Sequence, residues 1–172
     1  GAAAAADVPE LIPRREFLAV KPPDREIICL PRVEAAPAID GALDDAAWQK
    51  GFTSNRFTWG NGQPGANATD LWLAYDAGHV YLAVRCAVQD PAKLKTRLPE
   101  NYDGDGAWSD DCIDFKLSPD DGRTTYQFIV TAAGALYESK NGVAAWKGDW
   151  ARKARIGAKE YVVEVAIPLQ TI

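Results

Sequence analysis

The sequence predicts an all-β fold, an antiparallel β-sandwich of two packed sheets. Its short apolar segments alternate with polar residues at period two, which is the pattern of strands with one buried face. Turn residues such as Gly, Pro, Asp and Asn separate these segments at short intervals, as is typical of sandwiches. With 172 residues, 47% of them hydrophobic, the chain is long and apolar enough to bury one well-filled core.

Two parts are expected along the chain. Residues 1–31 form an arm or linker rich in Ala and Pro, with one short strand at 26–30. Residues 32–172 form the sandwich, which begins with a helical turn at 44–50 that Asp44 caps. The strands of the sandwich are expected at 70–75, 80–88, 113–117, 124–131, 135–139, 151–156 and 161–167.

Charge and composition exclude some partners. The net charge is −5 and no run of Lys or Arg is present, which argues against nucleic acid and anionic membranes and leaves a neutral ligand open. No apolar run approaches the roughly 20 residues that cross a bilayer, so membrane insertion is not expected. Residues 1–7 are typical of the small-residue end of a secretory signal region, or of a flexible Ala-rich linker. We expect export to the periplasm or the cell exterior.

The three cysteines cannot all pair with one another. Cys86 alternates with valines and is expected to face the core, Cys112 alternates with Asp114 and is expected to face outward, and Cys29 lies in the arm. Buried free thiols and one disulfide with a leftover thiol are both compatible with this pattern. Neither the spacing nor the neighbours indicate a zinc site or a reactive thiolate.

The most informative stretch is 108–117. It places Trp108 just ahead of a predicted strand in which Ile113, Phe115 and Leu117 alternate with Cys112, Asp114 and Lys116. An exposed indole beside carboxylates suits a neutral sugar ring, because the ring needs an apolar platform for its C–H face and acceptors for its hydroxyls. The alternative for Trp108 is a lid packed against the preceding loop.

Four segments, in this order, resemble the family 9 carbohydrate-binding modules: 37–48, 69–90, 108–134 and 161–168. The resemblance implies a β-sandwich that is appended to xylanases and other extracellular proteins. It also implies that a sugar at the reducing end of a glycan lies between two tryptophans, with polar side chains around it and structural calcium nearby.

By this resemblance, Trp108 is the first of the two tryptophans and Asp114 is an acidic residue that hydrogen-bonds the sugar. Two positions depart from the family pattern. The second tryptophan of the family lies well after the Ile-Pro motif, whereas this chain stops at Ile172. Ile129 stands where a related binder has an arginine that contacts the ligand. We therefore expect weak binding.

Arg85, Gln127 and Trp72 complete the predicted ligand site. The alternative for Asp114 is a cross-strand ion pair with Arg85, and the two roles are compatible. Trp72 is expected on the non-core side of its strand, either as a second stacking surface or covered by the arm. Trp48 is expected in the core. Trp150 is expected to pack structurally, and the role of Trp146 is left open.

Asp103 and Asp105 flank glycines in a segment that resembles the start of a calcium loop, although a bidentate Glu at the required spacing is missing. The alternative is a solvated acidic turn. No cofactor is required, and structural calcium is the one metal that the sequence suggests.

Catalysis has little support. The carboxylates of Asp110, Asp111 and Asp114 cluster in one short segment, whereas a glycosidase needs two carboxylates across a cleft. His79 is the only histidine and no serine motif lies near it. The sequence predicts non-catalytic glycan binding, with a catalytic domain in the same parent chain as a further partner. The alternative function is an accessory structural domain of a larger glycoside hydrolase or envelope protein, without a sugar site of its own.

Overall fold

The computed structural model describes residues 29–58 and 61–172. The secretory segment expected at 1–7 and most of the strand expected at 26–30 lie outside these residues. Cys29 and Leu30, the end of that expected strand, are not in a strand. In the described part of the chain, no helix is long and apolar enough to cross a membrane.

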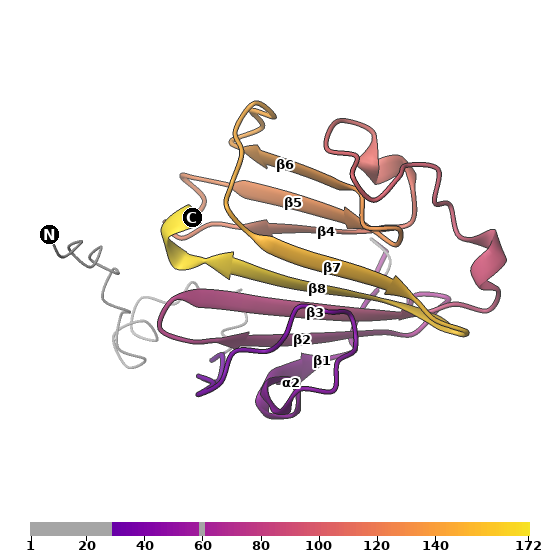
Figure 1. Cartoon of the computed structure of the whole chain (residues 1–172), viewed down its shortest axis with the longest axis horizontal. Coiled ribbons are helices and arrows are strands. Elements are labelled where there is room, and N and C mark those ends of the chain that lie inside the picture. Colours follow the sequence, from indigo (N-terminus) through magenta and orange to yellow (C-terminus); the bar gives the residue numbers. More distant parts are fainter. Residues whose placement is uncertain (1–28, 59–60) are drawn as a thin grey trace, which may run out of the picture.

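Within the described residues, eight strands form two antiparallel sheets, which confirms the predicted β-sandwich (Figure 1). The larger sheet has the order β1-β2-β3-β8-β7 and the smaller sheet has the order β4-β5-β6. The strands are β1 (Phe52–Ser54), β2 (Thr69–Tyr75), β3 (His79–Ala87), β4 (Cys112–Leu117), β5 (Tyr126–Thr131), β6 (Leu136–Lys140), β7 (Ala151–Ile156) and β8 (Glu160–Pro168). β1 was not predicted, because three residues are too few to show a period.

The helical segments are short. The helix α2 (Ala46–Lys50) precedes β1, and 3-10 turns occur at η1 (Pro91–Lys93), η2 (Ala107–Ser109) and η3 (Leu169–Thr171). The predicted cap of α2 is wrong. Asp45 rather than Asp44 is the N-cap residue, and it makes no side-chain cap hydrogen bond, because its carboxylate accepts from the N–H of Ala38 at 3.1 Å.

The main core lies between the two sheets. It is built from the facing side chains of β5 (Tyr126, Phe128 and Val130) and of β8 (Tyr161, Val163, Val165 and Ile167). Two tryptophans in the segment before β7 extend it. Trp146 and Trp150 lie edge-on to Phe128, with ring centroids 6.0 and 5.0 Å away. The structural packing predicted for Trp150 is confirmed, and Trp146, left open by the sequence, packs there as well.

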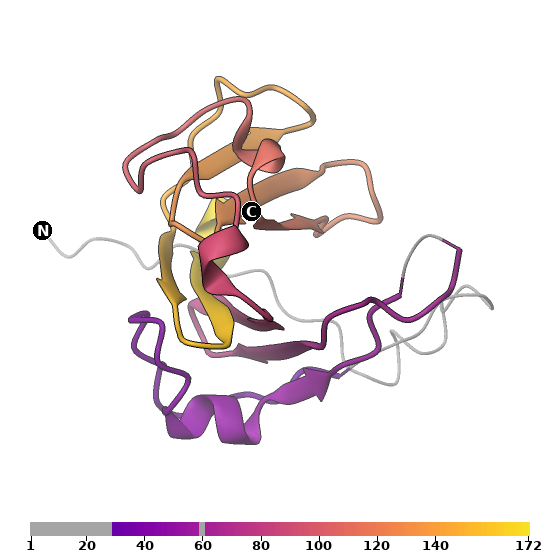
Figure 2. The ribbon, with the colours of Figure 1, turned by 90° about the vertical axis from the view of Figure 1, so that its right-hand side faces the viewer.

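The larger sheet is covered on its other face too. There α2 and the segment 33–43 pack around Trp48, which is 2% exposed, as predicted for a core residue. Alanines at 74, 83 and 166 line this face and let α2 and the segment 33–43, together called the cover, approach the sheet closely. Figure 2 shows α2 on the far side of the larger sheet from the smaller one.

Glu164 of β8 is fully buried and joins this cover to the sheet. Its carboxylate accepts hydrogen bonds from the N–H groups of Asp40 (2.8 Å), Gly41 (2.5 Å) and Leu43 (3.1 Å), and from the indole N–H of Trp48 (3.0 Å). A buried carboxylate is tolerated when such donors replace water. Glu164 therefore fixes the path of residues 40–43 across the sheet.

Gly41 makes this path possible. Its φ is +85°, and a Cβ atom there would lie 2.9 Å from Cβ of Arg155. Arg155 in turn donates from Nε to the carbonyl oxygen of Gly41 at 2.7 Å. Both the backbone conformation and the lack of space require glycine at this position.

The three cysteines are free. Cys86 is half-buried and packs against the main core, as predicted. Cys112 is half-buried, and burial, together with the carboxylates of Asp114 and Asp111, raises the pKa of its thiol to about 11. Burial also raises the pKa of the Cys86 thiol. Thiols of this kind are mostly protonated at neutral pH and react slowly.

Replacing Glu164 by Gln should lower the free energy of unfolding by about 3 kcal/mol. The side-chain NH2 group of Gln would point at backbone N–H groups, which are donors as well, and the remaining oxygen of Gln is a neutral acceptor in place of a charged one. Glu160→Gln, in the same strand but at a half-exposed side chain, is the matched control and should change it by less than about 0.5 kcal/mol. Urea unfolding measures both. Equal effects of the two substitutions would contradict the role given to Glu164.

Candidate functional site

Trp108 lies in η2, just before β4, with 70% of its surface exposed. The exposure predicted from the sequence is confirmed. Gly106 precedes the turn with φ +101°, and the neighbouring Ala107 is fully buried. η2 lies next to β4 and β5, so the turn that carries Trp108 is at the end of the smaller sheet at which β4 begins.

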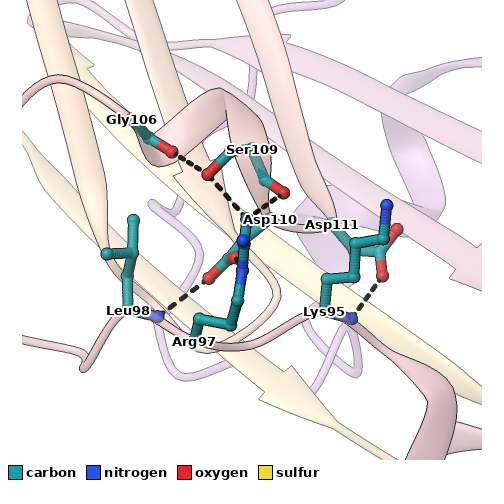
Figure 3. A network of polar contacts seen from close by, with 7 residues as sticks. All are labelled: Lys95, Arg97, Leu98, Gly106, Ser109, Asp110 and Asp111. Atoms are coloured by element: carbon teal, nitrogen blue, oxygen red, sulfur yellow. Dashed lines mark hydrogen bonds and ion pairs between the residues drawn. The ribbon is translucent and has the colours of Figure 1, made fainter.

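A network of polar contacts around Asp110 holds this turn (Figure 3). The carboxylate accepts from the N–H of Leu98 at 2.9 Å and from Nε of Arg97 at 3.0 Å. Nη2 of Arg97 also donates to the carbonyl oxygen of Ser109 at 2.7 Å, and the Ser109 hydroxyl donates to the carbonyl oxygen of Gly106 at 2.6 Å. These bonds join the residues after Trp108 to the irregular segment 95–98, and the Ser109 hydroxyl joins them to Gly106 before it.

Asp111 adds a second link to the same segment. Its carboxylate accepts from the N–H of Lys95 at 2.7 Å, and its own N–H donates to the carbonyl oxygen of Lys95 at 3.0 Å.

Asp110 is 5% exposed. Burial alone would raise the pKa of Asp110, but the hydrogen bonds from Leu98 and Arg97 and the charge of Arg97 outweigh it and hold the pKa below its ordinary value. The carboxylate is therefore charged at neutral pH.

The outer face of the smaller sheet carries Asp114 and Gln127. Asp114 is exposed, as predicted, and Nε2 of Gln127 donates to its two carboxylate oxygens at 3.1 and 2.9 Å. The cross-strand register places Ile129 and Tyr137 beside Asp114 on this face. Two paired strands thus hold the exposed carboxylate of Asp114 in place, on the sheet whose end carries the turn with Trp108.

Sequence reasoning missed two residues of this face, Tyr137 and Ser139. The register places Ser139 directly opposite Gln127. Ser139 is 1% exposed, and its hydroxyl has no hydrogen-bond partner in the described part of the chain. The signal that could have found both is the alternation within 136–140, where Tyr137 and Ser139 oppose Leu136 and Glu138.

The structure does not bring Arg85 and Trp72 to this face. Both lie on the larger sheet, where the Arg85 guanidinium stands 5.2 Å from the centroid of the Trp72 ring. Arg85 pairs with Asp70 at 2.8 Å, so the ion pair considered between Arg85 and Asp114 is wrong. Trp72 is half-buried and packs against the cluster that contains Trp48, and Arg85 stands over its ring. Cover by the arm concerns residues that lie mostly outside the described part of the chain.

The two predicted calcium ligands have separate contacts. Asp103 forms an ion pair with Nζ of Lys147 at 2.5 Å, and the carbonyl oxygen of Asp105 accepts from the hydroxyl of Tyr102. Among the described residues, no group of three or more Asp, Glu, His and Cys side chains is arranged to hold a metal ion. Calcium at Asp103 and Asp105 stays a prediction from the sequence.

The fold is similar to that of solved carbohydrate-binding structures. A family 9 module from Caldicellulosiruptor kristjanssonii in complex with glucose matches with a TM-score of 0.54 and 16% identity, over 80% of this chain and 68% of that chain. Its complex with cellotriose gives 0.51 and 17%, over 80% and 66%. A candidate carbohydrate-binding protein from Bacteroides uniformis gives 0.57 and 16%, over 83% and 72%.

At these identities the likeness concerns the fold, and the resemblance predicted from the sequence is confirmed at that level. No protein-family model matches the sequence, and the comparison with curated proteins finds no match either.

Replacing Asp110 by Asn should lower the free energy of unfolding at pH 7 by about 2 kcal/mol, because a charged acceptor is lost. The pKa of Asp110 is lowered in the folded state, so its carboxylate stabilises the fold at pH values above the ordinary carboxyl pKa of 3.8. This stabilisation is lost as the pH falls below that value. The difference between wild type and variant should therefore shrink below about pH 4.

Unfolding in urea across pH 2 to 7 measures this difference. Asp44→Asn, at an exposed carboxylate that makes no hydrogen bond or ion pair within the described residues, is the control and should follow the wild type throughout. A difference for Asp110→Asn that stays constant with pH would show that the charge is not what stabilises the turn.

Proposed function

We propose that this chain binds a neutral glycan and catalyses no reaction on it. Trp108 is the stacking platform, and Asp114 and Gln127 are the polar contacts. Three observations support this proposal: the exposed indole, the polar pair Asp114 and Gln127 on the sheet that follows its turn, and a fold similar to that of modules solved in complex with glucose and cellotriose. Arg85 and Trp72 are left out of the proposed site because they lie on the larger sheet.

The single observation that carries the proposal is the exposure of Trp108 in a turn that is held in place. Leaving 70% of an indole in water forgoes about 3 kcal/mol of burial free energy. Four contacts of Asp110, Arg97 and Ser109 fix the turn that presents it. A fixed platform loses little conformational freedom when a sugar stacks on it, which favours binding.

The polar contacts set the strength of binding. Asp114 keeps unused acceptor capacity after its bonds with Gln127, because an ionised carboxylate has about four lone-pair sites. One stacked ring and a few hydrogen bonds correspond to dissociation constants from about micromolar to about millimolar for small ligands. Neither stacking nor these hydrogen bonds needs a metal or another cofactor.

The absence of catalysis is supported by how the carboxylates are used. Asp110 and Asp111 are bonded to the segment 95–98, which leaves Asp114 as the exposed carboxylate of the three. A glycosidase needs two carboxylates on opposite sides of the scissile bond. The arrangement suits retention of a glycan outside the cytoplasm, with any catalytic domain elsewhere in the parent chain.

Trp108→Ala should abolish retention on a panel of insoluble glucans and xylans and weaken cellotriose binding by about tenfold or more, because the stacking contact is lost. The melting temperature should stay the same, since the indole is mostly exposed. Co-sedimentation with the insoluble polysaccharides measures retention, and calorimetric titration measures the binding of cellotriose. Val143→Ala, at a side chain 57% exposed, is the control and should bind like the wild type.

An unchanged affinity of Trp108→Ala would exclude the proposed platform. A wild type that binds none of the glycans would favour the other function considered, an accessory structural domain without a sugar site.

Asp114→Asn should weaken cellotriose binding by about tenfold while Trp108 still stacks, because a hydrogen bond to a charged acceptor is replaced by one to a neutral amide. Asp121→Asn, at an exposed loop carboxylate, is the matched control. Titration calorimetry reads out both variants, and equal affinities would remove Asp114 from the site.

A further inference from the structure

Gln127 lies in the central strand of the smaller sheet, with β4 on one side of it and β6 on the other. Toward β4, its Nε2 donates to the two carboxylate oxygens of Asp114 at 3.1 and 2.9 Å. Toward β6, it lies directly opposite Ser139. The amide of Gln127 therefore stands between an exposed carboxylate and a buried hydroxyl.

The hydroxyl of Ser139 is unusual in this structure. Within residues 29–58 and 61–172, it is the one buried side-chain oxygen or nitrogen that has no hydrogen-bond partner. A buried hydroxyl without a partner lowers stability, because it has lost its hydrogen bonds to water and gained none in return. Such groups are few in native structures, and each calls for an explanation.

A partner for this hydroxyl has to come from a neighbouring side chain, because Ser139 is 1% exposed. Asn141, two residues further along the chain, already accepts from the N–H of Thr125 at 2.8 Å through its amide oxygen. Gln127 is within reach from the facing strand, since directly opposite residues of an antiparallel pair have Cβ atoms about 4.5–5.5 Å apart. Rotation about its side-chain bonds brings the amide of Gln127 to the hydroxyl of Ser139.

We propose that Ser139 is a positioning residue for the glycan, an inference that rests on the binding function proposed above. In the free protein, the amide of Gln127 donates to Asp114. When a sugar hydroxyl donates to the carboxylate of Asp114 instead, the displaced amide turns to Ser139. Its oxygen then accepts from the Ser139 hydroxyl, which leaves both N–H donors of the amide for the sugar.

This movement links affinity to the stability of the free protein. The free protein carries the cost of the unpaired Ser139 hydroxyl, and the complex does not. Relief of that cost adds to the free energy of binding. Ser139 thus lowers the stability of the free protein and raises its affinity for the glycan, whereas a residue with a purely structural role would stabilise the free protein.

Ser139→Ala should weaken cellotriose binding by about fivefold, because binding no longer pairs a buried hydroxyl. Without ligand, its melting temperature should rise by about 2–4 °C, because the unpaired group is gone. Calorimetric titration and thermal unfolding measure the two effects. Thr53→Ala, at an exposed side chain of β1, is the control and should change neither.

Two results with Ser139→Ala would overturn the proposal. One is an affinity equal to that of the wild type. The other is a lowered melting temperature, since Ser139 would then stabilise the fold in the ordinary way.

The NMR signals of the side-chain NH2 group of Gln127 test the same movement without glycan. Asp114→Ala removes the acceptor and should send the amide to Ser139. The signals should therefore differ between Asp114→Ala and Asp114→Ala/Ser139→Ala, whereas Ser139→Ala alone should leave them close to their wild-type positions. Identical signals in Asp114→Ala and the double variant would overturn the proposal. A wild type that binds no cellotriose while these signals respond as expected would overturn the binding function and uphold the movement of Gln127.

Discussion

The buried carboxylate of Glu164 is the constraint on which the layered structure depends. A central strand with both faces covered has no water to solvate a charge, so four N–H donors from the cover must reach it. These donors come from positions 116 to 124 residues away in sequence. The charge thereby specifies where the cover lies, and the cover in turn buries Trp48 and the outer face of the larger sheet.

At the candidate site, Asp110 is likewise a buried carboxylate that several donors stabilise. A carboxylate with little exposure gathers donors from Leu98 and Arg97, and the turn that follows Gly106 is held as a result. Here the outcome is the reverse of burial, because the fixed turn presents Trp108 to solvent. An indole held in one place loses little freedom on binding, so a single stacked ring contributes more of its interaction to affinity.

Period two along the strands was enough to predict the sandwich, the exposure of Asp114 and the inward side of Cys86. The predicted core position of Trp48 and the exposure of Trp108 followed from their neighbours in sequence. Alternation says only whether a side chain faces the core of its own sheet, so it could not show that Arg85 and Asp114 belong to different sheets. Contacts across more than a hundred residues, such as that of Glu164 with Gly41, leave no local pattern. The position of Ser139 opposite Gln127 could not be predicted for a related reason, since it depends on the register of two strands.

The most direct test of the account is a two-dimensional NMR titration of the indole N–H signals of the six tryptophans with cellotriose. The account predicts that the Trp108 signal moves with added ligand, together with the backbone signals of Asp114 and Gln127. The buried Trp48 and the core-packed Trp150 should stay in place. A spectrum in which Trp108 is unmoved at saturating ligand, or in which Trp72 alone responds, would contradict it.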